Sequence, residues 1–413
     1  WEGSRSSLFT TLKGSSGQAS STAGTARVRR ILVCAQVMIA AVLLIPTGLF
    51  LKSLVNLFHV NLGIRTENVL MFRISLQLNG YKPEQSRALF ERVEAQMSAA
   101  PGVRSVSASM VGLIGGSRWG NGVKVEGYTS PDKDSGPHAL FNEIAPGHFG
   151  KMGIPLIMGR EFTENDTLAA PKVAIINEEF VRQYFGGQNP IGRHFGSPKP
   201  DLEVIGVVKD SHYSSVKEKP YSVYYTPWRQ DKQIGSLVFY IRSALPTDAI
   251  VPQIRKVMAS LDRDLPVENL RTLDDQVNRS ISQDRIVLQL AAAFAFLATS
   301  LAMLGLYGVM AHSMTRRTRE IGIRLALGAQ PGLIRRMVLR EMLWILTVGL
   351  VLGVPAALLL ARYTESQLYG VKAYDVGVVL GAVAALAVTA AAAGHFPARR
   401  ASKVNPVEAL RYE

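Results

Sequence analysis

ILVCAQVMIAAVLLIPTGLFL, residues 31–51, is the stretch that decides the fold, because it runs for 21 residues without a charged side chain. A helix of that length spans roughly 30 Å, the thickness of the hydrocarbon core of a bilayer. Arg27, Arg29 and Arg30 precede it. A secretory signal peptide is the alternative, but the run is long for one, and LFLKSL lacks the small residues of a cleavage site. We therefore expect an uncleaved transmembrane helix.

Three further runs without charge follow, at residues 286–310, 343–361 and 376–394. The alternative for each is a buried core helix. Four uncharged runs of this length favour membrane spans instead, and so does a composition that is 47% hydrophobic and only 19% charged. The predicted fold class is a membrane protein of four transmembrane helices with a mixed α/β extracytoplasmic domain inserted between helices 1 and 2.

The distribution of basic residues orients these helices. Residues 1–30, 311–342 and 395–413 together carry 16 lysines and arginines against five acidic residues. The segment 52–285 is nearly balanced, with 28 basic and 25 acidic residues. The positive-inside rule therefore places the three short segments in the cytoplasm. Most of the net charge of +14 is thus a topology signal, so we predict no nucleic-acid partner.

These observations predict a multi-pass membrane protein with a large external domain. Residues 1–30, rich in Ser, Gly and Thr, are typical of a flexible linker. The chain begins with Trp1, so we expect it to be a piece of something longer. The predicted boundaries are: cytoplasmic linker 1–30, helix 31–51, external domain 52–285, helix 286–310, cytoplasmic loop 311–342, helix 343–361, short external loop 362–375, helix 376–394 and cytoplasmic tail 395–413.

The four runs contain no Asp, Glu, Lys or Arg, which transporters that pass ions or protons usually keep inside the bundle. Gln36 and Gln289 are expected to form interhelical hydrogen bonds. The third and fourth helices each carry small residues four apart, which let helix backbones approach closely, and we expect these two helices to pack as a hairpin. The predicted helix-packing residues are Gly349, Gly353, Ala357, Gly377, Gly381 and Ala385.

The segment 52–285 alternates strand and helix patterns, which favours a mixed α/β domain. The predicted strands include residues 68–76 and the VRSVSASM segment that follows the helix 83–99. In KVAIINEEFVRQYFGG, Asn177 is the predicted N-cap between a strand and a helix, and Gly186 is its stop. LEVIGVVKD and SLVFYIRS are further predicted strands, and PTDAIVPQIRKVMASLD is a predicted amphipathic helix.

No constellation of catalytic residues is present in this domain. The single cysteine, Cys34, excludes an internal disulfide framework, and no HExxH, GxSxG or GxxxxGK[ST] motif occurs in the 413 residues. Glu178 and Glu179 sit at a predicted helix start, where carboxylates favour the helix dipole. Four glycines around Trp119 indicate a mobile turn more than a binding loop. We therefore predict no catalytic residue, no cofactor and no metal site.

The most basic stretch, TRRTREIGIRLALGAQPGLIRRMVLRE at residues 315–341, lies in the predicted cytoplasmic loop. Residues 315–327 are expected to be helical, with Gly328 as the stop and Pro331 as the first residue of a helix that runs into the third span. One interpretation is a helix resting on anionic headgroups. The break at Gly328 and the acidic Glu320 favour docking onto a partner instead.

This stretch closely resembles the cytoplasmic loop of MacB/FtsX-type ABC transporter permeases. VAIINEEFVRQYFGGQNPIGRHF and LEVIGVVKDSHYSSVKEKPYSVYY resemble the periplasmic core domain of that family, and FPARRASKVNPVEALRYE resembles its C-terminal signature. The lead-in and the RYE ending are most similar to the C-terminal half of the duplicated orphan permeases of acidobacteria. That finer resemblance implies that a first copy precedes Trp1.

The family resemblance implies a multi-pass permease of the bacterial inner membrane without catalysis of its own. It implies that the external domain 52–285 is a periplasmic core domain with a porter-like lobe and an inserted lobe. It implies three partners: a cytoplasmic P-loop ABC ATPase dimer, a second permease copy (a homodimer or a fused first half), and a periplasmic adaptor as a further candidate. Mechanotransmission for efflux or extrusion is the implied mechanism. The implied ATPase-coupling residues are Arg319, Glu320, Ile321, Gly322, Ile323, Arg324, Ala326, Leu327, Gly328 and Ala329.

Two other functions remain open from the sequence. One is a non-transporting membrane sensor whose external domain binds a ligand and whose loop relays the bound state. The other is an external enzyme that helices anchor in the membrane, but no constellation of residues supports it.

Overall fold

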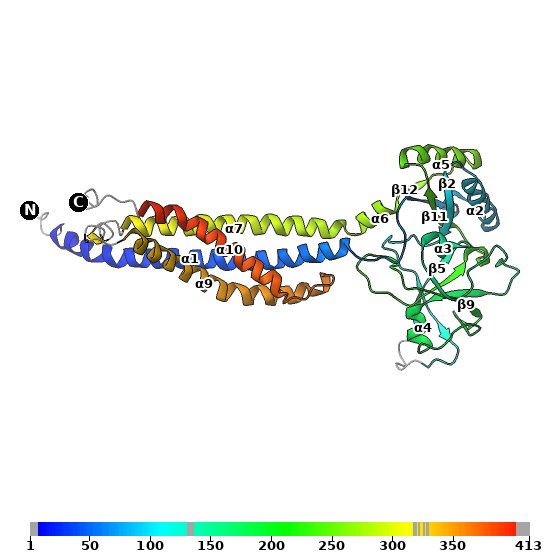
Figure 1. Cartoon of the computed structure of the whole chain (residues 1–413), viewed down its shortest axis with the longest axis horizontal. Coiled ribbons are helices and arrows are strands. Elements are labelled where there is room, and N and C mark those ends of the chain that lie inside the picture. The colour runs from blue at the N-terminus through cyan, green and yellow to red at the C-terminus, as the bar shows by residue number, and fades with distance from the viewer. Residues whose placement is uncertain are drawn as a thin grey trace, which may run out of the picture. The chain divides into compact units, whose positions relative to one another are not determined.

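The computed structural model describes residues 7–129, 136–316, 320, 323–324, 327 and 330–401, and for some of these the backbone alone. The chain divides into two compact units. One comprises Trp1–Phe58 with Asp284–Glu413, and the other comprises His59–Gln283. We describe each unit by itself (Figure 1).

The first unit is a helical bundle. Its helices are α1 (Ser7–Phe58), α7 (Ser282–Arg316), α9 (Pro331–Thr364) and α10 (Val376–Ala401). Each contains one stretch that is long and apolar enough to cross a membrane, namely Arg27–Phe58, Ser282–Thr315, Arg336–Gln367 and Val376–Pro397. The four predicted transmembrane helices, with the α/β unit between the first and the second, are thereby confirmed.

The helix α1 is longer than the sequence indicates. It begins at Ser7, so residues 7–30, expected to be a flexible linker, form its N-terminal part. Once the apolar stretch has formed a helix, each added residue gains one backbone hydrogen bond without a new nucleation cost. The helix α1 can therefore extend into a Ser- and Gly-rich segment although the residues there have no strong helix propensity.

Close backbone contact in the bundle occurs between α9 and α1. A Cβ on Gly349 would lie 2.6 Å from Val37 Cγ1, and a Cβ on Gly353 would lie 2.9 Å from the Cβ of Ala41. Ala357 on the same face is fully buried in a cluster with Ile45 and other residues of α1. Sequence analysis predicts α10 as the partner of this face, whereas the structure has α1 there. A small-residue face accepts any helix, so the pattern alone does not choose the partner.

The small-residue face of α10 has no such neighbour among the described residues. A Cβ on Gly381 would meet nothing within 4 Å, and one on Gly377 would meet only Asp375. Ala385 is exposed. Inside the bundle, Gln36 Oε1 is buried against Gly305 and has no hydrogen-bond partner in the described part of the chain, so the expected interhelical bond is not made by this oxygen.

The second unit is built on a mixed sheet. Its spatial order is β12-β1-β11-β2-β5-β10-β7-β9-β8-β4, with β3 on β5 and β6 on β9. The strands are β1 (Val69–Ser75), β2 (Val103–Ser109), β3 (Gly120–Gly122), β4 (Lys124–Val125), β5 (His138–Ile144), β6 (Leu156–Gly159), β7 (Val173–Asn177), β8 (His194–Gly196), β9 (Leu202–Val208), β10 (Val223–Pro227), β11 (Ser236–Ser243) and β12 (Glu268–Thr272).

The first lobe of this unit has the split β-α-β arrangement of ferredoxin-like folds. The antiparallel order β12-β1-β11-β2 joins with α2 (Pro83–Ser98) and α5 (Thr247–Leu261), whose apolar stripes pack on the sheet (Figure 1). Ile250, Ile254 and Met258 recur every four residues along α5 and are all buried, as a helix period requires. The strands and helices predicted for this lobe are confirmed.

The second lobe is inserted between β2 and β11. Its strands β5 and β10 are parallel, β10 and β7 are antiparallel, and β7 and β9 are parallel. The short helix α4 (Glu178–Tyr184) covers them, with Phe180 packing on Phe195 at a ring-centroid distance of 4.9 Å. Four small helical elements complete the described part of the unit: α3 (His148–Met152), α6 (Leu273–Ser280) and the 3₁₀ turns η1 (Gln77–Asn79) and η2 (Trp228–Gln230).

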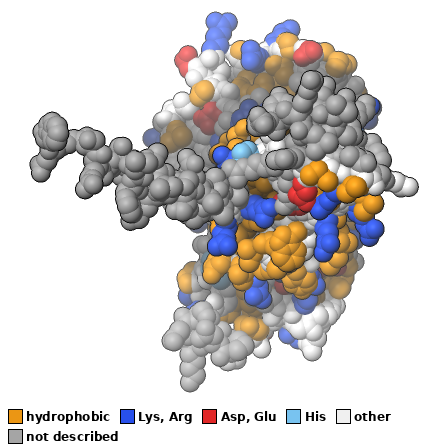
Figure 2. Space-filling view, turned by 90° about the vertical axis from the view of Figure 1, so that its left-hand side faces the viewer, with side chains coloured by type: hydrophobic (Ala, Val, Ile, Leu, Met, Phe, Trp, Pro, Cys, Tyr) orange, Lys and Arg blue, Asp and Glu red, His pale blue; other side chains and the backbone are white. Residues whose placement is uncertain are grey.

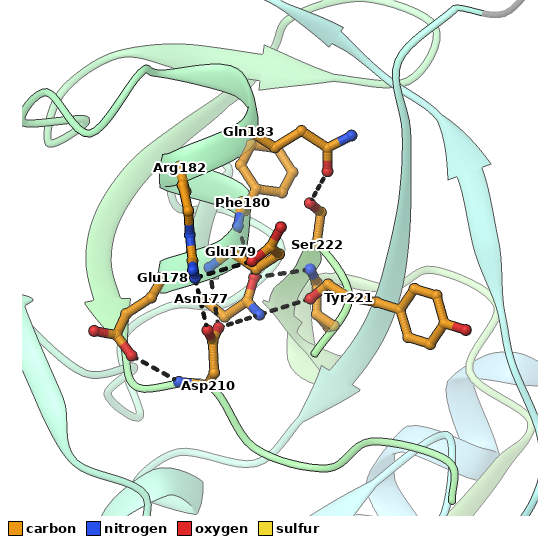
Figure 3. Close-up of polar contacts among 10 residues, drawn as sticks. Asn177, Glu178, Glu179, Phe180, Arg182, Gln183, Asp210, Tyr221 and Ser222 are labelled. Atoms are coloured by element: carbon orange, nitrogen blue, oxygen red, sulfur yellow. Dashed lines mark hydrogen bonds and ion pairs between the residues drawn. The ribbon is translucent and has the colours of Figure 1, made fainter. Parts of the chain in front are cut away.

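Asn177 fastens three segments of the inserted lobe (Figure 3). Its Oδ1 accepts hydrogen bonds from Phe180 N and Val223 N, so the predicted N-cap is confirmed. Its Nδ2 donates to Asp210 Oδ1 and to the carbonyl of Tyr221, both at 2.7 Å. One amide side chain thereby accepts a hydrogen bond from a free backbone N–H at the start of α4. It also joins β7 to the segments before β10 and after β9.

The two neighbouring carboxylates also have structural partners (Figure 3). Glu178 Oε2 accepts a hydrogen bond from Asp210 N, and Glu179 lies 2.9 Å from Arg182, which also contacts Asp210. These contacts favour the interpretation that the pair stabilises the helix start and does no chemistry.

The glycine-rich loop around Trp119 is not the turn that sequence analysis favours. Gly120–Gly122 forms β3 and pairs with β5, and Gly116 N donates to the carbonyl of Ser214 at 2.8 Å. Trp119 also accepts a backbone hydrogen bond from Phe141 N at 2.9 Å. Here glycine allows close approach to β5, because a Cβ on Gly120 would lie 2.5 Å from the His138 ring.

His148 is buried at the junction of β2 and α3. Its ring is 1% exposed, and its Nδ1 lies 2.8 Å from Ser107 Oγ. Tyr240 and Phe149 contact it edge-on. Burial, with a smaller contribution from the nearby charge of Lys151, lowers the pKa of His148 from 6.5 to about 3. The imidazole is therefore neutral in the folded protein.

This burial predicts a loss of stability in acid. Above pH 6.5 the imidazole is neutral in both the folded and the unfolded chain, so it contributes no pH dependence. Below pH 6.5 the unfolded chain takes up a proton that the folded chain does not. The free energy of unfolding should then fall by up to roughly 1.4 kcal/mol per pH unit until the folded pKa is reached. Urea unfolding of the full chain from pH 7.5 to 5 measures this slope.

Between those limits, His148→Gln should lose about 2 kcal/mol less of its free energy of unfolding than the wild type loses. An identical slope in wild type and His148→Gln would contradict the assignment.

Candidate functional site

The candidate coupling residues lie between α7 and α9. Glu320, Ile323, Arg324 and Leu327 belong to the described residues. The other predicted coupling residues lie outside the described residues, and these are Arg319, Ile321, Gly322, Ala326, Gly328 and Ala329.

The described part of the loop has local helical contacts. Arg324 Nη2 donates to Glu320 Oε1 at 2.5 Å, a pair four residues apart, and Leu327 N donates to the carbonyl of Ile323 at 3.0 Å. Arg324 Nη1 also lies 3.5 Å from Met337 Sδ, which connects this segment to α9. The described residues thus show local helical contacts and one side-chain contact from Arg324 to α9.

Two apolar side chains of this segment face outward. Leu327 is 83% exposed and Ile323 is 43% exposed. One exposed leucine is normal on a protein surface, but here both apolar side chains lie in a stretch rich in arginine. Figure 2 shows one face of the molecule on which lysine and arginine side chains lie around hydrophobic ones. A partner with acidic groups around an apolar contact would match such a surface.

The helix α9 begins at Pro331, so this proline is its first residue, as predicted. Val338 and Met342 are buried in the core of the bundle, together with residues of α1, α7 and α10. Val338 and Met342 are therefore packed against helices, whereas Leu333 and Leu339 of the same part of α9 are exposed. From Pro331 the helix continues unbroken to Thr364.

The start of α9 is tied to α1 by charge. Arg30 Nη2 lies 2.5 Å from Glu341 Oε1, and the two residues are 311 positions apart. Beside this ion pair is a hollow of about 570 Å³, lined by Met337, Arg340 and Trp344 among others. Sequence reasoning missed this pair because no local pattern relates positions so distant along the chain.

Comparison with known families identifies this architecture. The MacB-like periplasmic core domain matches residues 36–257, and the FtsX-like permease C-terminal domain matches residues 292–406. The chain belongs to the MacB/FtsX-type permease family. The resemblance stated from the sequence is thereby confirmed, while the assignment to a duplicated acidobacterial permease stays a prediction.

Individual relatives agree with this membership. The chain is 26% identical over 283 residues to the macrolide export ATP-binding/permease protein MacB of Burkholderia cenocepacia, covering 66% of this chain and 41% of that protein. It is 27% identical over 263 residues to the pyoverdine export ATP-binding/permease protein PvdT of Pseudomonas aeruginosa, covering 62% and 40%. The chain thus spans about two fifths of the length of these curated relatives.

A solved structure, the periplasmic region of MacB from Actinobacillus actinomycetemcomitans, matches 53% of this chain and 94% of that one at 20% identity and a TM-score of 0.35.

A MacB-like periplasmic domain between the first and second of four helices makes this permease a multi-pass inner-membrane protein. The segment between α7 and α9 is then expected on the cytoplasmic side.

Proposed function

We propose that the chain is the permease subunit of an ABC transporter that works by mechanotransmission. A partner ATPase would hydrolyse ATP in the cytoplasm, and the permease would convert that event into a rearrangement of its periplasmic unit for efflux or extrusion. The observation that carries the proposal is the continuity of α9, which begins beside the coupling loop and packs backbone to backbone on α1.

The path of a movement can be followed along the chain. A shift of the coupling loop moves the start of α9 through the contact between Arg324 and Met337. The helix has 34 residues and is therefore roughly 50 Å long, so it crosses the bilayer as one continuous helix. Gly349 and Gly353 have no side chain, so α1 packs directly on the backbone of α9, and the two helices would shift together. The chain leaves α1 at Phe58 and enters the periplasmic unit at His59.

The bundle offers no alternative route for a polar substrate. The four apolar runs contain no Asp, Glu, Lys or Arg. Passage of a polar solute through such a bundle would leave its charges without partners in a low-dielectric interior. A substrate that is handled entirely on the periplasmic side avoids that cost.

The ATPase activity would lie in a partner. The two relatives carry both functions in their names, ATP-binding and permease, whereas these 413 residues contain no GxxxxGK[ST] motif. We therefore propose a P-loop ATPase dimer as the cytoplasmic partner. A second permease copy, either a homodimer mate or a fused first half, would complete a symmetric assembly, and a periplasmic adaptor is a further candidate. The export named for the relatives supports the outward direction.

A pull-down from native membranes tests the proposal. Tagged wild-type chain should bring down a P-loop ATPase, and a variant with residues 319–329 scrambled should lose it. Both chains should be recovered in equal amounts, which is the control for insertion and folding. If neither chain brings down an ATPase, the coupling role is contradicted and the sensor interpretation gains support.

A further inference from the structure

A hollow of about 500 Å³ lies at the junction of the two lobes of the periplasmic unit. The ferredoxin-like lobe contributes Arg73 and Ser236, and the inserted lobe contributes Trp119, Phe141, Glu143 and Asp231. A volume of this size accommodates a small organic molecule. None of these residues belongs to the coupling site.

One wall of the hollow carries two carboxyl groups. Glu143 Oε2 is buried and has no hydrogen-bond partner among the described residues. Burial, and then the charge of Asp231 and a hydrogen bond shared with that side chain, raise the pKa of Glu143 well above its usual range, while Oε2 is the oxygen left without a partner. A buried carboxyl oxygen without a partner is costly, and a second carboxyl beside it makes ionisation costlier still. A cation with N–H donors would satisfy the oxygen and offset the repulsion between the two groups.

The adjoining wall is aromatic. Phe141 and Glu143 are two residues apart on β5, so their side chains lie on the same face of the strand. The Trp119 ring contacts Phe141 edge-on at a centroid distance of 6.2 Å and is 53% exposed. Backbone pairing of β3 with β5 fixes Trp119 in place, so this surface exists before a ligand arrives. Aromatic faces attract cations as well as flat apolar groups.

The opposite wall supplies a donor. Arg73 Nη1 donates to Ser236 Oγ at 3.0 Å, and Arg73 also borders a smaller hollow of about 170 Å³ beside Arg271. The guanidinium has further N–H groups to offer. A ligand that places its positive group at Glu143 would present a hydrogen-bond acceptor, not a second cation, toward Arg73.

We infer that this cleft binds an amphiphilic organic cation, in which a protonated amine carried on a flat apolar body faces Glu143 and Asp231 while the body lies against Trp119 and Phe141. The inference goes beyond the proposed function, because it holds whether the periplasmic unit exports its ligand or only senses it. Binding requires no ATPase, so the two proposals fail independently.

Three probes of the same size test the charge requirement. They are 1-naphthylmethylamine, 1-naphthalenemethanol and 1-naphthylacetate, which are cationic, neutral and anionic at pH 7. Calorimetric titration uses the full chain in nanodiscs, with empty nanodiscs as the background for partition into lipid. The amine should bind about tenfold more tightly than the alcohol, and the carboxylate should bind more weakly than either. Equal binding of all three probes would overturn the inference.

Glu143→Gln keeps the shape of the side chain and removes the carboxyl group that would ionise against a bound amine, so it should weaken amine binding about tenfold and leave alcohol binding unchanged. The matched control is Glu91→Gln on the exposed side of α2, which should bind the amine as wild type does. Trp119→Ala removes a half-exposed ring, so this variant should fold even if Glu143→Gln does not. It should weaken the binding of both the amine and the alcohol. Amine binding that is unchanged in Glu143→Gln, or in Trp119→Ala where the first variant does not fold, would refute the site.

Discussion

Replacing Glu320 by lysine is expected to abolish stimulation of the partner ATPase, with a loss of about tenfold or more, while the chain remains folded. Glu320 and Arg324 are each half exposed, and their ion pair spans one helical turn. Such a pair contributes only roughly 0.2–0.5 kcal/mol to stability, so its loss does not unfold the protein. A reversed charge in the docking surface instead repels whatever group of the ATPase meets Glu320. The measurement is ATP hydrolysis by the co-purified ATPase, with and without the permease, in proteoliposomes.

The matched control is Glu365→Lys, the same substitution at an exposed site beyond the other end of α9. It should leave stimulation unchanged, because it lies away from the cytoplasmic loop. Gly328→Pro is a second test, since it alters the predicted break between the two helical segments. Full stimulation in both Glu320→Lys and Gly328→Pro would refute the coupling role of the loop.

Replacing Gly353 by leucine is expected to cost about 3 kcal/mol of bundle stability and to abolish ATPase stimulation at the same time. Even a Cβ at this position would lie 2.9 Å from the Cβ of Ala41 and 3.0 Å from the carbonyl oxygen of Met38. A leucine side chain would therefore force α9 away from α1. Thermal unfolding of the purified chain in detergent gives the stability change, and the proteoliposome assay gives the coupling.

Gly381→Leu on α10 is the matched control, because a side chain there meets nothing within 4 Å in this chain. It should leave the melting temperature of the isolated chain within about a degree of wild type. If Gly353→Leu and Gly381→Leu lower the melting temperature equally, the close contact between α9 and α1 does not exist in the bundle.

The elements that the sequence predicted well are those with a complete local signal. The strand at Val69–Ser75, the helix at Thr247–Leu261 and the N-cap at Asn177 each follow from spacing or from one capping side chain within a few residues. The membrane spans follow from length and absence of charge. In each case the decisive information lies inside the element itself.

Features that depend on distant pairing could not be predicted in this way. The order in which β5 and β10 enter the sheet depends on contacts about 80 residues apart, such as Leu140 with Val223. The partner of the Gly349–Gly353 face is on α1, about 310 residues away. The loop around Trp119 has a mobile-turn composition, and only its pairing with β5 turns it into a wall of the cleft. The predicted coupling positions 320 and 329 lie nine residues apart, and nothing in that spacing shows what these residues do. Their role in coupling stays a prediction.

The insertion of one lobe into another has an evolutionary consequence. The inserted lobe leaves the ferredoxin-like lobe after β2 and returns at β11, two strands that pair with each other, with Ser109 opposite Val238. Its entry and exit are therefore neighbours, so a cassette of different length or shape could be exchanged there without altering the register of the parent strands. The hollow with Glu143 lies at this seam. Selection could thus change which ligand the periplasmic unit recognises by replacing or reshaping the inserted lobe alone. The transmembrane helices and the coupling loop would be inherited unchanged.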